Sequence, residues 1–101
     1  MRINITVSGD TAMIDMNGRF DFNAQRDFRD AYDPQLKNAA VANIHVNLAG
    51  VDYLDSSALG MLLMLRERAA SSGKDLKLCK PNASVAQILE IANFSKLFTI
   101  E

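Results

Sequence analysis

The chain has 101 residues, of which 49% are hydrophobic, and its 11 basic and 12 acidic side chains leave a formal net charge of −1. This length suits one domain with a real core, so we expect residues 1–101 to form a single domain. The balanced charge argues against a nucleic-acid-binding surface. The sequence contains no run of 18 apolar residues, so no membrane span is expected.

The N-terminal segment predicts a β-hairpin over residues 2–17, because two runs of alternating residues flank Ser8-Gly9-Asp10, which has turn chemistry. The alternating apolar residues are Ile3, Ile5, Val7, Ala12, Ile14 and Met16. Asn17-Gly18 is predicted to close the second strand. An alternating start is not a signal peptide.

The next segment predicts a first helix with Asn23 as its N-cap. Its apolar stripe consists of Ala24, Phe28, Ala31, Tyr32 and Leu36. Pro34 lies inside a long version of this helix, so we expect an end or a kink near Asp33.

Alternation over residues 44–48 predicts a third strand, which runs directly into the loop at Asp55. Residues 56–72 predict a second helix, and Gly73 is a suitable residue to follow its C-terminus.

The remaining segments predict a fourth strand at residues 76–79, a third helix opened by Pro81-Asn82, and a short turn and last strand after Phe94. The predicted order is β-β-α-β-α-β-α-β. The strand, helix and strand around residues 44–79 should form a right-handed parallel unit, with helices covering the sheet.

Asp55, Ser56 and Ser57 stand where the third strand gives way to the second helix. Aspartate and serine are common N-cap residues, so simple capping is one explanation. The other is a modifiable serine, since a helix N-terminus favours negative charge and would accommodate a phosphate.

The helix over residues 56–72 is more apolar than one sheet-facing stripe requires. On a helical wheel, Leu59, Leu62 and Leu63 form the core side, with Ala69 and Ala70 below them. A second side carries Ser57, Gly60, Met61, Met64, Glu67 and Arg68, and is predicted to face water. Either loops and neighbouring helices cover the two methionines, or they form an adaptable docking surface for a partner.

The sequence gives little support to an enzyme. Its single histidine, His45, is predicted to point opposite to the apolar residues of its strand. No serine–histidine–aspartate set, metal-ligand cluster or glycine-rich phosphate loop is present, so we expect no cofactor and no metal. The lone Cys79 is predicted to be a strand-core thiol, which fits a reducing compartment and a cytoplasmic protein.

Three stretches together resemble the STAS domain family, in particular the bacterial anti-sigma factor antagonists. The most specific is Asn47-Leu-Ala-Gly-Val-Asp-Tyr-Leu-Asp-Ser-Ser-Ala-Leu-Gly60, with its Asp-Ser-Ser-X-Leu-Gly element. The others are Gly18-Arg-Phe-Asp21, and Pro81-Asn-Ala-Ser-Val85 together with Phe94-Ser-Lys-Leu-Phe98. The resemblance covers essentially the whole chain.

The resemblance implies an α/β fold with a mixed β-sheet and helices packed largely on one face. It also implies a partner switch in which a serine-kinase anti-sigma factor phosphorylates Ser56 and a PP2C-type phosphatase resets it. The unphosphorylated form would sequester the kinase, freeing a sigma factor or another signalling client. ATP would belong to the kinase.

The same resemblance implies that Asp21 lies near the phosphoacceptor, that Asp55 is the motif acid and that Ser57 is the second motif serine. Gly60, Met61 and Met64 would extend the partner surface. Ala58, where many members carry glycine, and Phe22 depart from the family pattern but leave the phosphoacceptor in place. The chain resembles stand-alone antagonists rather than transporter tails.

Two other functions are kept as alternatives, namely a small-ligand or nucleotide-binding module and a structural subunit of a signalling complex. The switch predicts that Ser56→Asp weakens partner binding while Ser56→Ala preserves it. The surface position predicted for Met61 implies that Met61→Asp weakens binding without unfolding.

Overall fold

A computed structural model describes residues 1–101 and gives the element order predicted from the sequence. The strands are β1 (Arg2–Ser8), β2 (Thr11–Phe20), β3 (Asn43–Leu54), β4 (Asp75–Cys79) and β5 (Thr99–Ile100). The helices are α1 (Gln25–Lys37), α2 (Ser56–Ser71) and α3 (Ala83–Ile91), with 3₁₀ turns at Phe22–Ala24 and Phe94–Lys96.

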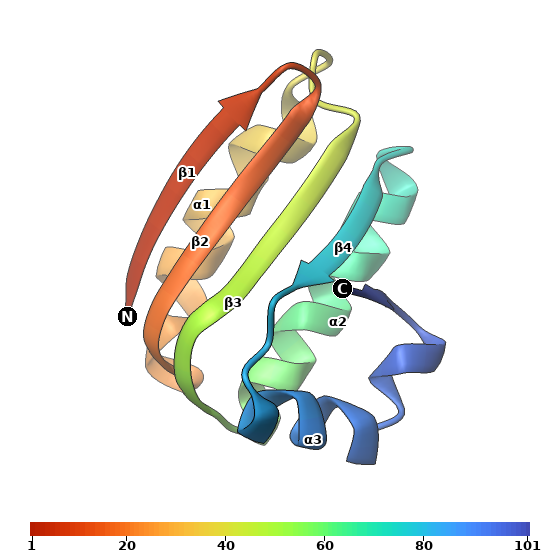
Figure 1. Ribbon diagram of the computed structural model, residues 1–101. Coiled ribbons are helices and arrows are strands. Elements are labelled where there is room, and N and C mark those ends of the chain that lie inside the picture. The colour runs from red at the N-terminus through yellow and green to blue at the C-terminus, as the bar shows by residue number, and fades with distance from the viewer.

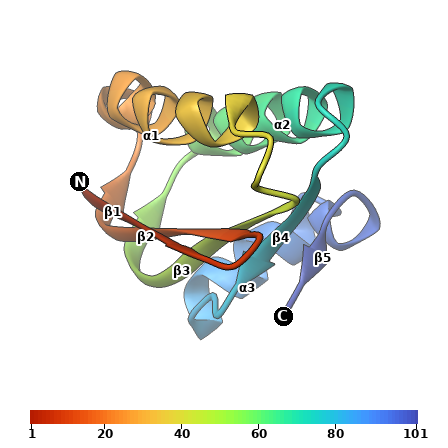
Figure 2. The same ribbon diagram turned by 90° about the horizontal axis from the view of Figure 1, so that it is seen from above.

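The five strands form one mixed sheet in the order β1-β2-β3-β4-β5, in which only the β1–β2 pair is antiparallel. Figure 1 shows this order, with α1 and α2 behind the sheet and α3 near the ends of β3 and β4. Figure 2 shows α1 and α2 side by side over one face, and α3 on the other side. The predicted α/β fold with a mixed sheet and helices largely on one face is confirmed.

The core lies between the sheet and the α1–α2 layer. Ile14, Val46 and Leu78 are register partners on adjacent strands, and all three are fully buried. Burial of such side chains contributes roughly 1.5–3 kcal/mol each. His45 lies on the opposite face of β3, as the alternation predicts, with Lys77 as its neighbour on β4.

The prediction that Asn17-Gly18 closes the second strand is wrong. β2 continues to Phe20, because irregularities in its pairing with β3 between Asp15 and Asn17, and again after Gly18, absorb the turn-like residues. Gly18 has a φ of +105°, a conformation that glycine adopts without strain. The extra residues carry the chain to Asp21 at the end of the sheet.

One expectation for the first helix is wrong, and a second is wrong in part. Asp21, not Asn23, caps the start, because its carboxylate accepts the Asn23 N–H at 3.0 Å and a 3₁₀ turn precedes α1. Of the end or kink expected near Asp33, the end does not occur, because α1 continues through Pro34 to Lys37. Pro34 lies in the last turn, so its missing N–H removes a single hydrogen bond near the end of the helix.

Further differences concern the edges of the sheet. Ile5 and Val7 of β1 are exposed rather than half-buried, because β1 is an edge strand and α1 covers only part of it. Cys79 is buried as predicted, and burial, followed by the charge of Glu101, raises the pKa of its thiol. None of the helices is long and apolar enough to span a membrane.

Candidate functional site

The candidate site forms where β2 and β3 end side by side. These strands are parallel, and Phe20 at the end of β2 pairs with Leu54 at the end of β3. The Asp55 N–H donates to the Phe20 carbonyl at 3.3 Å. Asp21 and Asp55 therefore begin two neighbouring loops, which lead into the 3₁₀ turn before α1 and into α2.

Asp55 is the N-cap of α2. Its carboxylate accepts the Ala58 N–H at 2.9 Å and the Ser57 hydroxyl at 2.7 Å. The hydrogen bond from Ser57 and then the one from the Ala58 backbone lower the pKa of Asp55, because they favour the ionised form. The capping role expected from the sequence is therefore present. Because its pKa is lowered, Asp55 is ionised at neutral pH.

The two adjacent serines have different surroundings. Ser57 is half-buried, and its hydroxyl is committed to the Asp55 carboxylate. Ser56, the first residue of α2, is exposed, and its hydroxyl forms no hydrogen bond within the chain. Of the two hydroxyls, only that of Ser56 is both free and accessible to a modifying enzyme.

Asp21 has a structural role in the neighbouring loop. Besides capping the 3₁₀ turn, its carboxylate lies 3.6 Å from the Arg19 Nε. The Arg19 guanidinium in turn lies 4.3 Å from the centre of the Tyr53 ring, which is exposed. Arg19 thus offsets part of the negative charge that Asp21 brings to the site.

The prediction that Met61 faces water is wrong. Met61 is only 9% exposed and belongs to the core cluster, whereas Met64 on the next turn is 52% exposed. The helical wheel treated α2 as packing on the sheet alone, but α1 lies beside α2 and covers the Met61 side. Conversely, Leu59 and Leu63, predicted to be core, are only partly buried.

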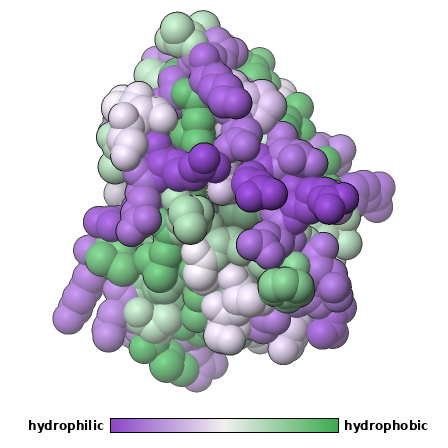
Figure 3. Space-filling view, turned by 180° about the vertical axis from the view of Figure 1, so that it is seen from behind, coloured by the Kyte–Doolittle hydropathy of each residue, from purple (hydrophilic) through white to green (hydrophobic).

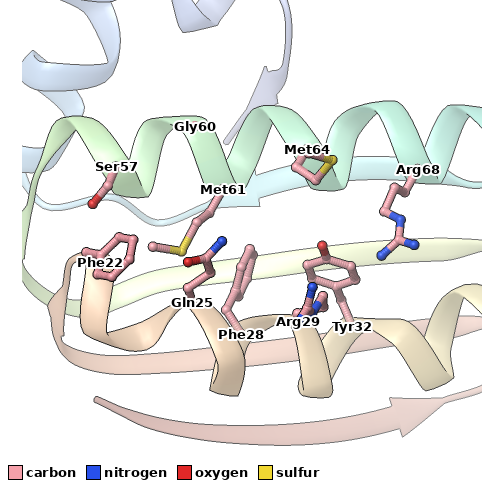
Figure 4. A pocket seen from close by; sticks show the side chains of 10 residues that line it. All are labelled: Phe22, Gln25, Phe28, Arg29, Tyr32, Ser57, Gly60, Met61, Met64 and Arg68. Carbon is pink, nitrogen blue, oxygen red and sulfur yellow. The ribbon is translucent and has the colours of Figure 1, made fainter.

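A half-open groove of about 480 Å³ runs between α1 and α2 and is called here the α1–α2 groove. Its lining residues are Phe22, Gln25, Phe28, Arg29, Tyr32, Ser57, Gly60, Met61, Met64 and Arg68. Figure 4 shows α2 on one side of the groove and α1 with its preceding 3₁₀ turn on the other, with Ser57 and Phe22 at one end and Arg68 at the other. Figure 3 shows this helical face, where apolar groups are more frequent in the lower part.

The α1–α2 groove brings together Ser57, Gly60, Met61 and Met64, as the sequence grouped them, with Met61 on the floor. The α1 residues opposite them were missed as site residues. The sequence pattern identifies Phe28 and Tyr32 only as members of an apolar stripe. Phe22 is 66% exposed, and its place directly before a helix is the one sequence feature that could have indicated a groove residue on this side.

Gly60 lies inside α2, where a glycine costs roughly 0.5–1 kcal/mol relative to alanine. A Cβ built on Gly60 would have no neighbouring atom within 4 Å, so packing within the chain does not require glycine there. The missing side chain instead leaves open space in the α1–α2 groove beside Met61 and Met64.

We predict that Asp55→Ala lowers the urea midpoint of unfolding at neutral pH, because two hydrogen bonds to the carboxylate are lost. The pKa of Asp55 is lowered in the folded state, so its stabilisation is present above the ordinary aspartate pKa of 3.8 and is lost as pH falls through the lower pKa of the folded state. The difference between wild type and variant should therefore shrink in acid.

The matched control is Asp52→Ala, which removes an exposed acid of β3 that accepts no side-chain hydrogen bond. Urea titrations followed by circular dichroism at neutral and acidic pH make the comparison. Equal midpoints for Asp55→Ala and Asp52→Ala at neutral pH, or a difference that persists unchanged in acid, would refute the capping role.

No group of three or more histidine, cysteine, aspartate or glutamate side chains is placed to hold a metal ion. His45 lies in the middle of β3, paired with Met13 and Lys77 of the neighbouring strands, and not in the loops that carry Ser56. The geometry therefore offers a capped, acidic helix start and an apolar groove beside it.

Comparison with known proteins gives one family and one fold. The family model described as "Mlab, STAS domain" matches residues 3–99. A STAS-domain containing protein of Pseudomonas aeruginosa (strain UCBPP-PA14) is 42% identical over 97 residues, covering 94% of this chain and 92% of that protein.

Solved structures with low sequence identity share the fold. The anti-sigma factor antagonist SpoIIAA in its unphosphorylated form has a TM-score of 0.81 at 19% identity, with 99% of this chain and 88% of that chain covered. The phosphorylated form of SpoIIAA, a Bacillus cell fate determinant, has a TM-score of 0.75 at 18% identity, with 99% and 91% covered. A candidate anti-sigma factor antagonist from Thermotoga maritima has a TM-score of 0.86 at 21% identity, with 97% and 84% covered.

Proposed function

We propose that this chain, which belongs to the STAS domain family, is a partner-binding switch controlled by phosphorylation of Ser56. The unphosphorylated form binds a serine-kinase anti-sigma factor or a related regulator, and that kinase phosphorylates Ser56. A PP2C-type phosphatase restores the binding form. In this proposal residues 1–101 act as one domain in the cytoplasm, with no catalysis and no cofactor of their own.

The observation that carries the proposal is the difference between the two serines. The Ser56 hydroxyl is exposed and free at the first position of α2, while the Ser57 hydroxyl is held by Asp55 at 2.7 Å. A kinase can take Ser56 into its active site without breaking a hydrogen bond of the fold. Phosphorylation of Ser57 would first require the Asp55 cap to give up one of its donors.

Electrostatics supports a change of surface rather than a change of fold. A phosphate at Ser56 lies at the positive end of the α2 dipole, which favours an anion there. It also adds about −1.5 to −2 charges beside Asp55 and near Asp21. The helix can tolerate this charge, while a partner that contacts the same loops must desolvate it or place a cation against it.

We propose that the partner surface surrounds Ser56. It comprises Asp21, Asp55, Ser57, Gly60 and Met64, and the exposed ring of Phe22 extends it. Met61 supports this surface from below, since it is largely buried. The pattern of an apolar centre beside a charged rim resembles that of many protein interfaces.

A fold relative provides further support. SpoIIAA has been solved in both unphosphorylated and phosphorylated forms, and both share the architecture of this chain. A fold of this kind therefore holds a phosphorylated state without being lost. Applied to this chain, the same behaviour would let Ser56 switch binding with little rearrangement.

The experiment that tests the proposal compares Ser56→Ala with Ser56→Asp as baits for partner capture from the native host. The switch predicts that a partner captured by Ser56→Ala is depleted from Ser56→Asp. A structural subunit with an inert serine predicts equal capture by both variants, and that outcome would refute the switch.

A further inference from the structure

The α1–α2 groove contains a polar group that the proposed switch does not use. Tyr32 is only 3% exposed, yet its hydroxyl points into the groove and forms no hydrogen bond within the chain. The buried side-chain atom that lacks a partner is Gln35 Oε1, so the Tyr32 hydroxyl is open to the groove rather than enclosed in the core. The hydroxyl can therefore donate a hydrogen bond to a molecule bound in the groove.

The charge around this hydroxyl is positive. Arg29 of α1 lines the groove and has no carboxylate within ion-pair distance. Arg68 of α2 lines the same end, and its Nη1 donates to Asp33 at 3.0 Å, which leaves further N–H groups of the guanidinium available. The residues that line the groove thus include two arginines and no carboxylate.

The rest of the groove is mostly apolar, with Gln25 and Ser57 as its polar residues. Phe28 and Met61 form its buried floor, and the exposed side chains of Phe22 and Met64 flank its mouth. Gly60 contributes no side chain, although an alanine would fit its helix better. The groove therefore has a cationic, hydrogen-bonding end beside Tyr32 and an apolar end towards Phe22 (Figure 4).

We propose that the α1–α2 groove binds a small amphipathic organic anion, a carboxylate with an apolar tail of about ten carbons. The carboxylate accepts a hydrogen bond from the Tyr32 hydroxyl and pairs with Arg29, and the tail lies on Phe28, Met61 and Met64. The volume of about 480 Å³ falls in the range of small-molecule sites, which are concave, mostly apolar and fixed by a few polar groups.

This inference does not depend on phosphorylation of Ser56. Ser57 lines the apolar end of the groove and is hydrogen-bonded to Asp55, so a bound ligand would lie next to the candidate switch. Ligand binding alone nevertheless tests this site. A result that refutes the phosphorylation switch would not refute ligand binding in the groove.

The test is a titration of ¹⁵N-labelled protein with decanoate, followed by two-dimensional NMR. We expect saturable shifts confined to the groove-lining residues of α1 and α2. Decyltrimethylammonium, which has the same tail and the opposite charge, should bind at least tenfold more weakly because it opposes Arg29.

Three variants and one control assign the contacts. Tyr32→Phe removes only the hydroxyl and should weaken decanoate binding about tenfold or more, since a hydrogen bond to a charged group is lost. Arg29→Gln should weaken it similarly, while Arg26→Gln, which removes an exposed arginine of α1 outside the groove, should not. Gly60→Leu should block the tail, because its added side chain enters open space.

Equal binding of decanoate and the cationic probe would overturn the proposal, as would unchanged affinity in both Tyr32→Phe and Arg29→Gln. Linear, unsaturable shifts, or saturable shifts outside the groove, would overturn it as well. Arg29 is exposed, so Arg29→Gln keeps the test decisive even if Tyr32→Phe disturbs the fold.

Discussion

Met61→Asp is expected to unfold the protein or to remove most of its stability. Met61 is 9% exposed and packs in the core cluster between α1 and α2. The substitution removes buried apolar contacts and introduces an unpaired carboxylate. Together these changes lower the free energy of unfolding by about 4 kcal/mol or more. A domain of this size has only about 5–15 kcal/mol of total stability.

The matched control is Met64→Asp, one turn along the same helix, where the side chain is 52% exposed. It makes the same chemical change in water and should alter stability by about 0.5 kcal/mol or less. Urea unfolding followed by circular dichroism compares the two variants. A folded Met61→Asp with wild-type stability would mean that α1 does not cover Met61.

Ser56→Asp is expected to weaken binding of the partner by about tenfold or more, while Ser56→Ala keeps it. The new carboxylate lies beside Asp55 and near Asp21, so a partner that approaches these loops must bury a further negative charge. Each tenfold loss corresponds to about 1.4 kcal/mol, which is modest for a desolvated charge at an interface. Quantitative mass spectrometry of captured partners measures the ratio.

Ser84→Asp is the matched control for Ser56→Asp. Ser84 is exposed near the start of α3, so the variant adds the same charge close to another helix N-terminus but outside the proposed surface. Partner capture by Ser84→Asp should equal that of wild type. Equal loss in Ser84→Asp and Ser56→Asp would indicate a general charge effect and contradict a specific role for Ser56.

The sequence predicted the order of elements because alternation and helical spacing are local signals. The strand at residues 44–48, the helix after Asp55 and Gly73 after its end all appear in the structure. The predicted ends of elements are wrong where contacts between residues distant in the sequence override a local signal. Pairing with β3 carried β2 through Asn17-Gly18 to Phe20.

The candidate site was predicted in part. Asp55 at a helix start follows from residue type and position, and the structure gives it the expected cap. The sequence alone does not show that the Ser57 hydroxyl is taken by Asp55 while that of Ser56 is free. Likewise, a helical wheel for α2 contains no information about α1, so it placed Met61 on the surface and missed Tyr32 across the groove.

The central claim is that Ser56 is the phosphoacceptor, and it is tested most directly by locating phosphate on protein purified from its native host. The tryptic peptide of residues 38–66 carries only three hydroxyl side chains, those of Tyr53, Ser56 and Ser57. Peptide fragmentation therefore assigns the site. We predict phosphate on Ser56 in part of the population. Phosphate on Ser57 alone, or none under any of several growth conditions, would contradict the switch.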